Sequence, residues 1–347
     1  MKAELIAPTG KGMSTTEPKY EIFVGDCVES MRKMPNQSVH CCVTSPPYFG
    51  LRDYGVDGQI GLEPTPDEFV AALVSVFREV RRVLRDDGTL WLNLGDSYAS
   101  TGGHTKLGES SQRQGRKNVS EQHKVKGFAG GDGIKVKDLI GIPWRVAFAL
   151  QADGWYLRQD IIWHKPNPMP ESVRDRCTKA HEYIFLLSKS PRYYFDGEAV
   201  KEDAVKGAAG SKFNSGKSAE HQLGRSSDRE RVEDGKRNRR SVWSVSTKPF
   251  KGAHFATFPP DLIEPCILAG CPVGGTVLDP FGGSGTTAGV AIKNERSAVL
   301  CELNPDYASL VPSRVLAIVG RAAPVPVNDN RSVSNSDWEA MVAELIG

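Results

Sequence analysis

The 347-residue sequence contains no run of about 20 apolar residues, and its N-terminus lacks the apolar stretch of a signal peptide. Neither a membrane span nor a secretory leader is therefore expected, and the sequence predicts a cytoplasmic protein. None of the seven cysteines belongs to a Cys-x-x-Cys pair, and no His/Cys/Asp cluster has the spacing of a zinc site. We expect reduced, buried thiols and no metal.

The sequence also lacks a large excess of charge of one sign. It contains 44 Lys and Arg residues and 42 Asp and Glu residues, for a net charge of +2. The distribution is nevertheless uneven. Residues 101–137 hold eight basic and three acidic residues, and residues 201–251 hold thirteen and seven. Such segments are either solvated surface insertions or basic elements that follow a phosphate backbone, and they leave the rest of the chain acidic.

No internal repeat is present, and helical and strand patterns alternate along the chain. The clearest helix begins at Thr65, followed by Pro66 and by Glu68 of a capping box, and should end before the turn residues 86–88. Apolar runs that would be buried on both faces favour an α/β fold with a doubly wound, mostly parallel sheet. Strands are predicted at 21–25, 38–43, 89–94, 155–163, 275–280 and 297–303, and further helices at 27–34, 138–152, 259–270, 286–293 and 336–346.

The first motif with chemical content is Thr-Ser-Pro-Pro-Tyr at residues 44–48, where a predicted strand ends. Two consecutive prolines cannot continue a strand ladder, so the chain turns outward at the carboxyl end of the sheet, where ligands bind in open α/β folds. The prolines hold the Ser45 side chain and the Pro46 carbonyl as a rigid pair of acceptors, and Tyr48 offers a flat face beside them. In isolation, this pattern also fits a structural proline-rich loop.

The second motif is Asp-Pro-Phe-Gly-Gly-Ser-Gly-Thr-Thr at residues 279–287, between a predicted strand and a predicted helix. Such a glycine turn lets a ligand approach the backbone closely and presents the amides of a helix N-terminus. No Lys follows the glycines, so a nucleoside-triphosphate site is not expected. The next strand ends at Glu302, about 20 residues further on, where a carboxylate can accept hydrogen bonds from both ribose hydroxyls of a nucleoside.

Together these motifs resemble the amino-group DNA methyltransferases that use S-adenosylmethionine, over roughly residues 21–319. The tetrapeptide Ser-Pro-Pro-Tyr matches the catalytic motif of that family, and Phe281-x-Gly283-x-Gly285 matches its cofactor motif. The catalytic motif precedes the cofactor motif, an order that looks like the circularly permuted β group of the family. The resemblance implies a Rossmann-like methyltransferase fold, double-stranded DNA as the substrate and a base that is flipped out of the duplex.

The resemblance also assigns roles to residues by motif. It implies a catalytic role for Ser45, Pro46, Pro47 and Tyr48, with residues 161–188, including His164 and Glu182, along the base pocket. Residue Asp26 would lie near the cofactor adenine, and a helix over residues 254–267 would cover the methionine end of the cofactor. The full set of implied cofactor contacts is Asp26, Cys27, Thr44, His254, Phe258, Asp279, Pro280, Phe281, Gly283, Gly285, Thr286, Thr287 and Glu302.

Several alternatives remain open at this point. In the resembling family, Ser at the first position of the tetrapeptide is associated mostly with N4 of cytosine, which we favour over N6 of adenine. C5 methylation is not expected, because Pro265-Cys266 precedes the cofactor loop and lies within a predicted helix. An RNA or protein methyltransferase and a nonenzymatic DNA-binding protein are further alternatives. A restriction endonuclease is a candidate partner, and the apolar stripe of the last helix makes a homodimer a candidate.

The same reasoning divides the chain into segments. The expected order is a lead-in at 1–19, the first catalytic part at 20–100, a basic insertion at 101–137, the continuation of the catalytic domain at 138–195, a target-recognition region at 196–251, the cofactor-binding part at 252–320, and a linker with a terminal helix at 321–347.

Overall fold

The computed structural model describes residues 18–100, 127–204, 235–247 and 258–320. His254, the predicted terminal helix and most of both basic segments lie outside these residues, so the expectations for them are carried forward as proposals. Within the described ranges, no helix is both long and apolar enough to cross a membrane.

One eight-stranded sheet organises the described residues, in the order β1-β10-β9-β2-β3-β5-β4-β8. Neighbouring strands of this sheet run parallel, except that β5 is antiparallel to both β3 and β4. The predicted α/β class with a mostly parallel sheet is therefore confirmed. The strands are β1 Tyr20–Val24, β2 Val39–Thr44, β3 Leu84–Leu94, β4 Tyr156–His164, β5 His181–Ser188, β8 Val242–Ser244, β9 Thr276–Asp279 and β10 Ser297–Glu302.

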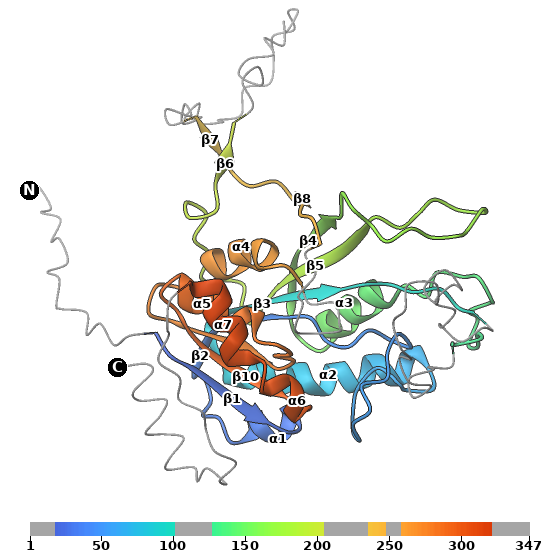
Figure 1. The fold of residues 1–347 in the computed structure, drawn as a ribbon, viewed down its shortest axis with the longest axis horizontal. Helices are drawn as coiled ribbons and strands as arrows, with labels where there is room; N and C mark the ends of the chain where they lie inside the picture. Colours follow the sequence, from blue (N-terminus) through green and yellow to red (C-terminus); the bar gives the residue numbers. More distant parts are fainter. Residues whose placement is uncertain (1–17, 101–126, 205–234, 248–257, 321–347) are drawn as a thin grey trace, which may run out of the picture.

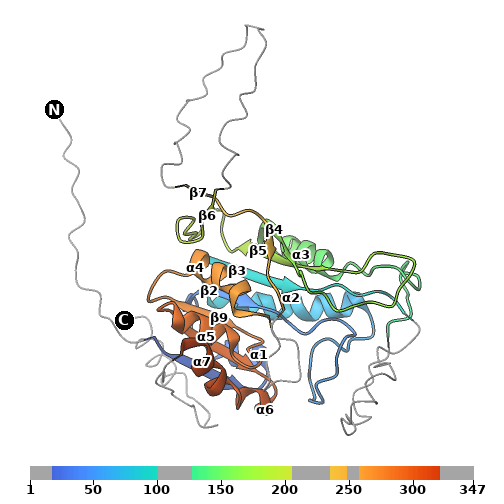
Figure 2. The same ribbon diagram turned by 45° about the horizontal axis from the view of Figure 1, so that its top comes forward.

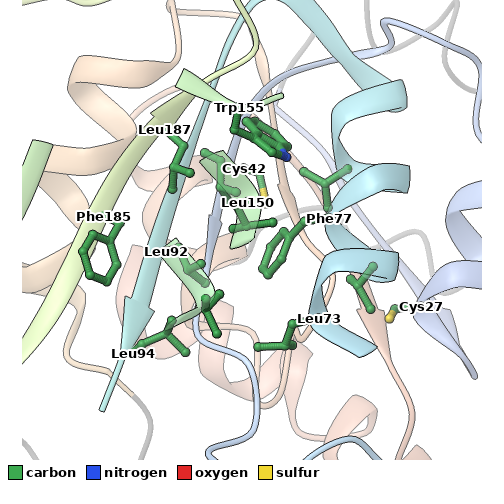
Figure 3. Close-up of a cluster of buried hydrophobic side chains, with 14 of the residues drawn as sticks. Cys27, Cys42, Leu73, Phe77, Leu92, Leu94, Leu150, Trp155, Phe185 and Leu187 are labelled. Carbon is green, nitrogen blue, oxygen red and sulfur yellow. The ribbon is translucent and has the colours of Figure 1, made fainter. Parts of the chain in front are cut away.

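Helices cover both faces of the sheet (Figures 1 and 2). One apolar core joins α1, α2 and α3 to the sheet, and a second core joins α4, α5 and α7 to its other face. Figure 3 shows the first core, in which Leu73 and Phe77 of α2 lie near Leu92 of β3. The helices are α1 Cys27–Arg32, α2 Pro66–Val83, α3 Ile142–Ala152, α4 Pro260–Gly270, α5 Thr286–Lys293, α6 Pro305–Ala308 and α7 Val311–Val319.

The start of α2 agrees with the sequence, because Thr65 and Glu68 form the predicted capping box. Its end also agrees, because the helix stops at Val83, before residues 86–88. The predicted turn at residues 86–88 is wrong, because β3 begins at Leu84 and continues through them. The pairing of β2 with β3 shifts register here, so the polar residues form an irregularity in the ladder in place of a separate loop.

The expectation of buried thiols holds for six of the seven cysteines, all of which are free. It is wrong for Cys177, which is exposed in the connection between β4 and β5. That connection runs beyond the sheet (Figure 1), and none of its residues belongs to either of the two apolar cores. A short antiparallel pair, β6 Glu202–Asp203 and β7 Lys236–Arg237, lies at the top of the same view.

Candidate active site

The two predicted motifs meet at the carboxyl edge of the sheet. Strands β2 and β9 pair in parallel through Cys41 with Val277 and Cys42 with Leu278, so the segments that follow the two strands leave the sheet side by side. Strands β10 and β1 continue the same edge, where the Gly25 amide donates to the Glu302 carbonyl at 2.9 Å. Four adjacent strands thus deliver the predicted residues to one place.

A buried carboxylate joins the two motifs directly. Asp279 is 1% exposed, and its Oδ1 accepts hydrogen bonds from the Thr44 hydroxyl at 2.6 Å and the Phe281 amide at 3.1 Å. Its Oδ2 accepts from the Thr287 hydroxyl at 2.6 Å. Burial raises the pKa of Asp279 to about 6, although these hydrogen bonds stabilise the charged form. The carboxylate therefore fixes the catalytic segment against the cofactor turn.

Tyr48 is held at both its ring and its hydroxyl. The hydroxyl donates to Glu182 Oε2 at 2.7 Å and lies 3.3 Å from Asn93 Oδ1. Ser45 Oγ donates a long hydrogen bond of 3.5 Å to the same hydroxyl. Gly95 lies against the ring, since a Cβ at this position would meet Tyr48 Cε2 at 2.5 Å. Burial, followed by the charge of Glu182, raises the pKa of Tyr48, so the phenol stays protonated.

The glycine turn after β9 is shaped by backbone conformations that favour glycine. Gly283 has φ +52° and Gly285 has φ +88°, and Gly285 is the N-cap of α5 without a side-chain hydrogen bond. The Gly283 amide donates to Glu302 Oε2 and the Asn304 amide to Glu302 Oε1, each at 2.8 Å. These contacts fix the carboxylate beside the turn, and burial raises the pKa of Glu302.

Comparisons with known proteins show the family of the chain. A family model described as DNA methylase matches residues 39–312. The chain belongs to this DNA methylase family. It is 50% identical over 295 residues to the type II methyltransferase M.Cfr9I of Citrobacter freundii, covering 85% of this chain and 87% of the relative. It is 49% identical over 296 residues to M.SmaI of Serratia marcescens, covering 85% and 90%.

The protein is therefore a type II DNA methyltransferase of the class that methylates exocyclic amines and uses S-adenosylmethionine. Solved structures show the fold of the methyltransferase. PvuII DNA methyltransferase (cytosine-N4-specific) has a TM-score of 0.57 at 18% identity, over 95% of this chain and 94% of that one. A DNA modification methylase of Thermus thermophilus, TTHA0409, complexed with S-adenosyl-L-methionine, has a TM-score of 0.53 at 24% identity, over 89% and 100%. Both likenesses are to Rossmann-like proteins, as the sequence predicted.

The residues around the glycine turn of the methyltransferase fit S-adenosylmethionine. A Cβ built on Gly283 would meet only the Phe281 carbonyl, at 3.9 Å, so there is room beside this backbone for a ligand. Ser284 Oγ is buried and has no hydrogen-bond partner among the described residues. The first amides of α5 and the remaining lone pairs of Glu302 complete a set of donors and acceptors that suits a zwitterionic nucleoside.

Most predicted site residues of the methyltransferase lie at this edge. Asp26 is the N-cap of α1, where it accepts from the Glu29 amide at 2.9 Å, and Cys27 is the first residue of that helix. Phe258 packs against the second core beside α4, and His254 lies outside the described residues. The cofactor contacts implied for all of these residues stay predictions. Residues that follow β2 are Ser45, Pro46, Pro47 and Tyr48, and those at the β9–α5 turn are Asp279, Pro280, Phe281, Gly283, Gly285, Thr286 and Thr287.

Two further predictions concern C5 methylation and a metal ion. Cys266 lies within α4 and is 1% exposed among apolar side chains, which confirms the predicted core position. Among the described residues, no group of three or more His, Cys, Asp or Glu side chains could hold a metal ion.

Sequence reasoning missed Gly95, Asn93 and Ser284. Gly95 directly follows β3, and nothing in the neighbouring sequence indicates that it contacts Tyr48. The contact joins the end of β3 to the segment after β2, which is distant in the sequence. Ser284 lies inside the recognised glycine motif and could have been found there by its position. The resemblance placed Glu182 along the base pocket without a contact, and the structure gives it Tyr48 as a partner.

Proposed function

We propose that the methyltransferase transfers a methyl group to N4 of a cytosine that is extruded from duplex DNA. The observation that carries this proposal is Ser45 at the first position of the tetrapeptide, on a segment held next to the cofactor turn through Thr44 and Asp279. N6 of adenine is the alternative, because its amine has a similar geometry.

The chemistry requires the amine to become a better nucleophile. Its lone pair is delocalised into the ring, and hydrogen bonds from its two N–H groups to Ser45 Oγ and the Pro46 carbonyl would favour tetrahedral geometry. The Ser45 hydroxyl exchanges partners at little cost, since its hydrogen bond to Tyr48 is 3.5 Å long. S-adenosylmethionine supplies an activated methyl group, so orientation contributes more than a strong base would.

Tyr48 is proposed to stack on the extruded base, an interaction worth on the order of 1–3 kcal/mol. Its hydroxyl and one region of its ring are already in contact with Glu182 and Gly95, so stacking would use the remaining ring surface. Glu302 is proposed to bind the ribose hydroxyls of the cofactor and Asp26 to lie near the adenine. Asp279 is not proposed to contact the cofactor directly; it is proposed to hold the segment after β2 and the glycine turn together.

The basic segments 101–137 and 201–251 are proposed to contact the DNA backbone, with 196–251 as the target-recognition region. A restriction endonuclease that cuts the same sequence is the proposed functional partner, as for type II modification enzymes. Pairing of two chains through the terminal segment and a cytoplasmic location are proposals of the same kind.

The test of this function is radiolabelled methyl transfer to duplex DNA by the wild type, Ser45→Ala and Tyr48→Ala. Both variants are expected to lose most incorporation while they keep binding S-adenosylmethionine. Equal incorporation by all three proteins would refute the proposed roles of Ser45 and Tyr48. Digestion of the product to nucleosides and mass analysis then distinguish N4-methylcytosine from N6-methyladenine, and the latter would overturn the choice of base.

A further inference from the structure

The hydroxyl end of Tyr48 lies in a polar network that the proposed chemistry does not use. We propose that Glu182 is a positioning residue that orients the Tyr48 ring for the extruded base. This inference rests on the proposed stacking role of Tyr48. It adds a residue from β5, on the far side of β3 from the catalytic segment.

The contacts around Glu182 fix its carboxylate from several sides. Oε2 accepts the Tyr48 hydroxyl at 2.7 Å and lies 3.3 Å from Asn93 Nδ2. Asn93 is itself fixed, since its Nδ2 donates to the Tyr183 carbonyl at 3.0 Å. The Glu182 backbone pairs with Trp163 of β4, so the carboxylate extends from an ordered part of the sheet.

A lysine compensates the charge of Glu182. The Lys165 ammonium forms an ion pair with Oε1 of Glu182, and the two side chains are 19% and 13% exposed. Lys165 Nζ also lies 4.3 Å from the centroid of the Trp163 ring, a cation–π contact that holds the ammonium in place. A carboxylate that is so enclosed would be costly to bury without such a partner.

This arrangement suits orientation better than proton transfer. Both oxygens of Glu182 already accept hydrogen bonds, and the Tyr48 phenol keeps its proton and donates a hydrogen bond to one of them. A tyrosine held by both its hydroxyl and its ring face has little rotational freedom left. Holding the ring in advance spares the entropy of ordering it when the base arrives.

The proposal is tested by a double-mutant cycle of Tyr48→Phe and Glu182→Ala, with kcat for methyl transfer as the readout. The kcat of each single variant is expected to fall about 10-fold, which corresponds to the free energy of one hydrogen bond to a charged group. The double variant should also lose about 10-fold, because Glu182 acts through the hydroxyl that Tyr48→Phe removes. A loss of about 100-fold, the product of the two, would overturn the proposal.

Controls separate this outcome from unfolding and from failure of the proposed function. Glu79→Ala removes a carboxylate that is 21% exposed and paired with Arg82 on α2, and it should leave kcat unchanged. Unfolding curves should show that every variant compared is folded under the assay conditions, and its S-adenosylmethionine affinity should match the wild type. If Glu182→Ala fails to fold, the cycle is run with Glu182→Gln, whose smaller loss should likewise vanish in the Tyr48→Phe background. Tyr48→Ala with wild-type activity would instead refute the stacking role itself.

Discussion

Replacing Gly95 with alanine should slow methyl transfer strongly, because the added methyl group would enter the space of the Tyr48 ring. The new Cβ would lie 2.5 Å from Cε2, 3.0 Å from Cδ2 and 3.2 Å from Cζ of that ring, whereas ordinary contacts begin at 3.4 Å. The ring must therefore move by about 0.9 Å, and a misplacement near 1 Å can cost on the order of 100-fold in rate. We expect kcat to fall by about that factor, with little change in cofactor affinity.

The assay is single-turnover methyl transfer with saturating DNA and cofactor, together with urea unfolding. Gly88→Ala is the matched control, since its Cβ would also be too close to neighbouring atoms, at 2.9–3.1 Å, but within β3 and away from Tyr48. It should lower stability but leave the kcat of the folded protein unchanged. Gly95→Ala should lower the free energy of unfolding when Tyr48 is present, and it should not lower it in a Tyr48→Ala background. An unchanged kcat for Gly95→Ala, or an equal stability loss in both backgrounds, would refute the steric reasoning.

The remaining predictions concern the two carboxylates and the DNA. The raised pKa of Asp279, about 6, means that its stabilising contribution is complete below pH 4 and is lost as the pH rises through 6. Asp279→Asn should remove this slope, roughly 2 kcal/mol between pH 4 and 7, in urea unfolding at stepped pH, and an unchanged slope would contradict it. Glu302→Ala should weaken S-adenosylmethionine binding about 10- to 100-fold by calorimetry without changing KM for DNA, and unaltered affinity would exclude the ribose contact. DNA affinity should fall roughly 10- to 100-fold between 50 and 200 mM salt, and a flat response would argue against backbone contacts by the basic segments.

Local signals in the sequence predicted the parts of the fold that depend on neighbouring residues. The capping box at Thr65 and the strand–glycine–helix pattern around Gly283 and Gly285 are properties of short segments, and the structure has both. The predicted break at residues 86–88 was wrong, because pairing with β2 absorbs the polar residues as an irregularity in the ladder. Turn propensity was outweighed there by tertiary pairing.

The contacts that position Tyr48 could not be predicted in the same way. Gly95 and Glu182 reach the ring through the order of strands, in which β5 lies next to β3 and runs antiparallel to it. Periodicity shows that a segment is a strand and gives no information about its neighbours. The tetrapeptide could be recognised because it directly follows one strand, β2. The residues that position Tyr48 come from two other strands, β3 and β5.

The hydrogen bond between Thr44 and Asp279 joins residues that are 235 positions apart in the chain. At 5–20 residues per second, a ribosome needs about 10–50 s to pass from one to the other. During that time the catalytic segment exists without the carboxylate that fixes it, and β2 lacks one of its two neighbouring strands. If the proposed roles of the tetrapeptide and Asp279 hold, a nascent or truncated chain would therefore contain the tetrapeptide before it could act on DNA.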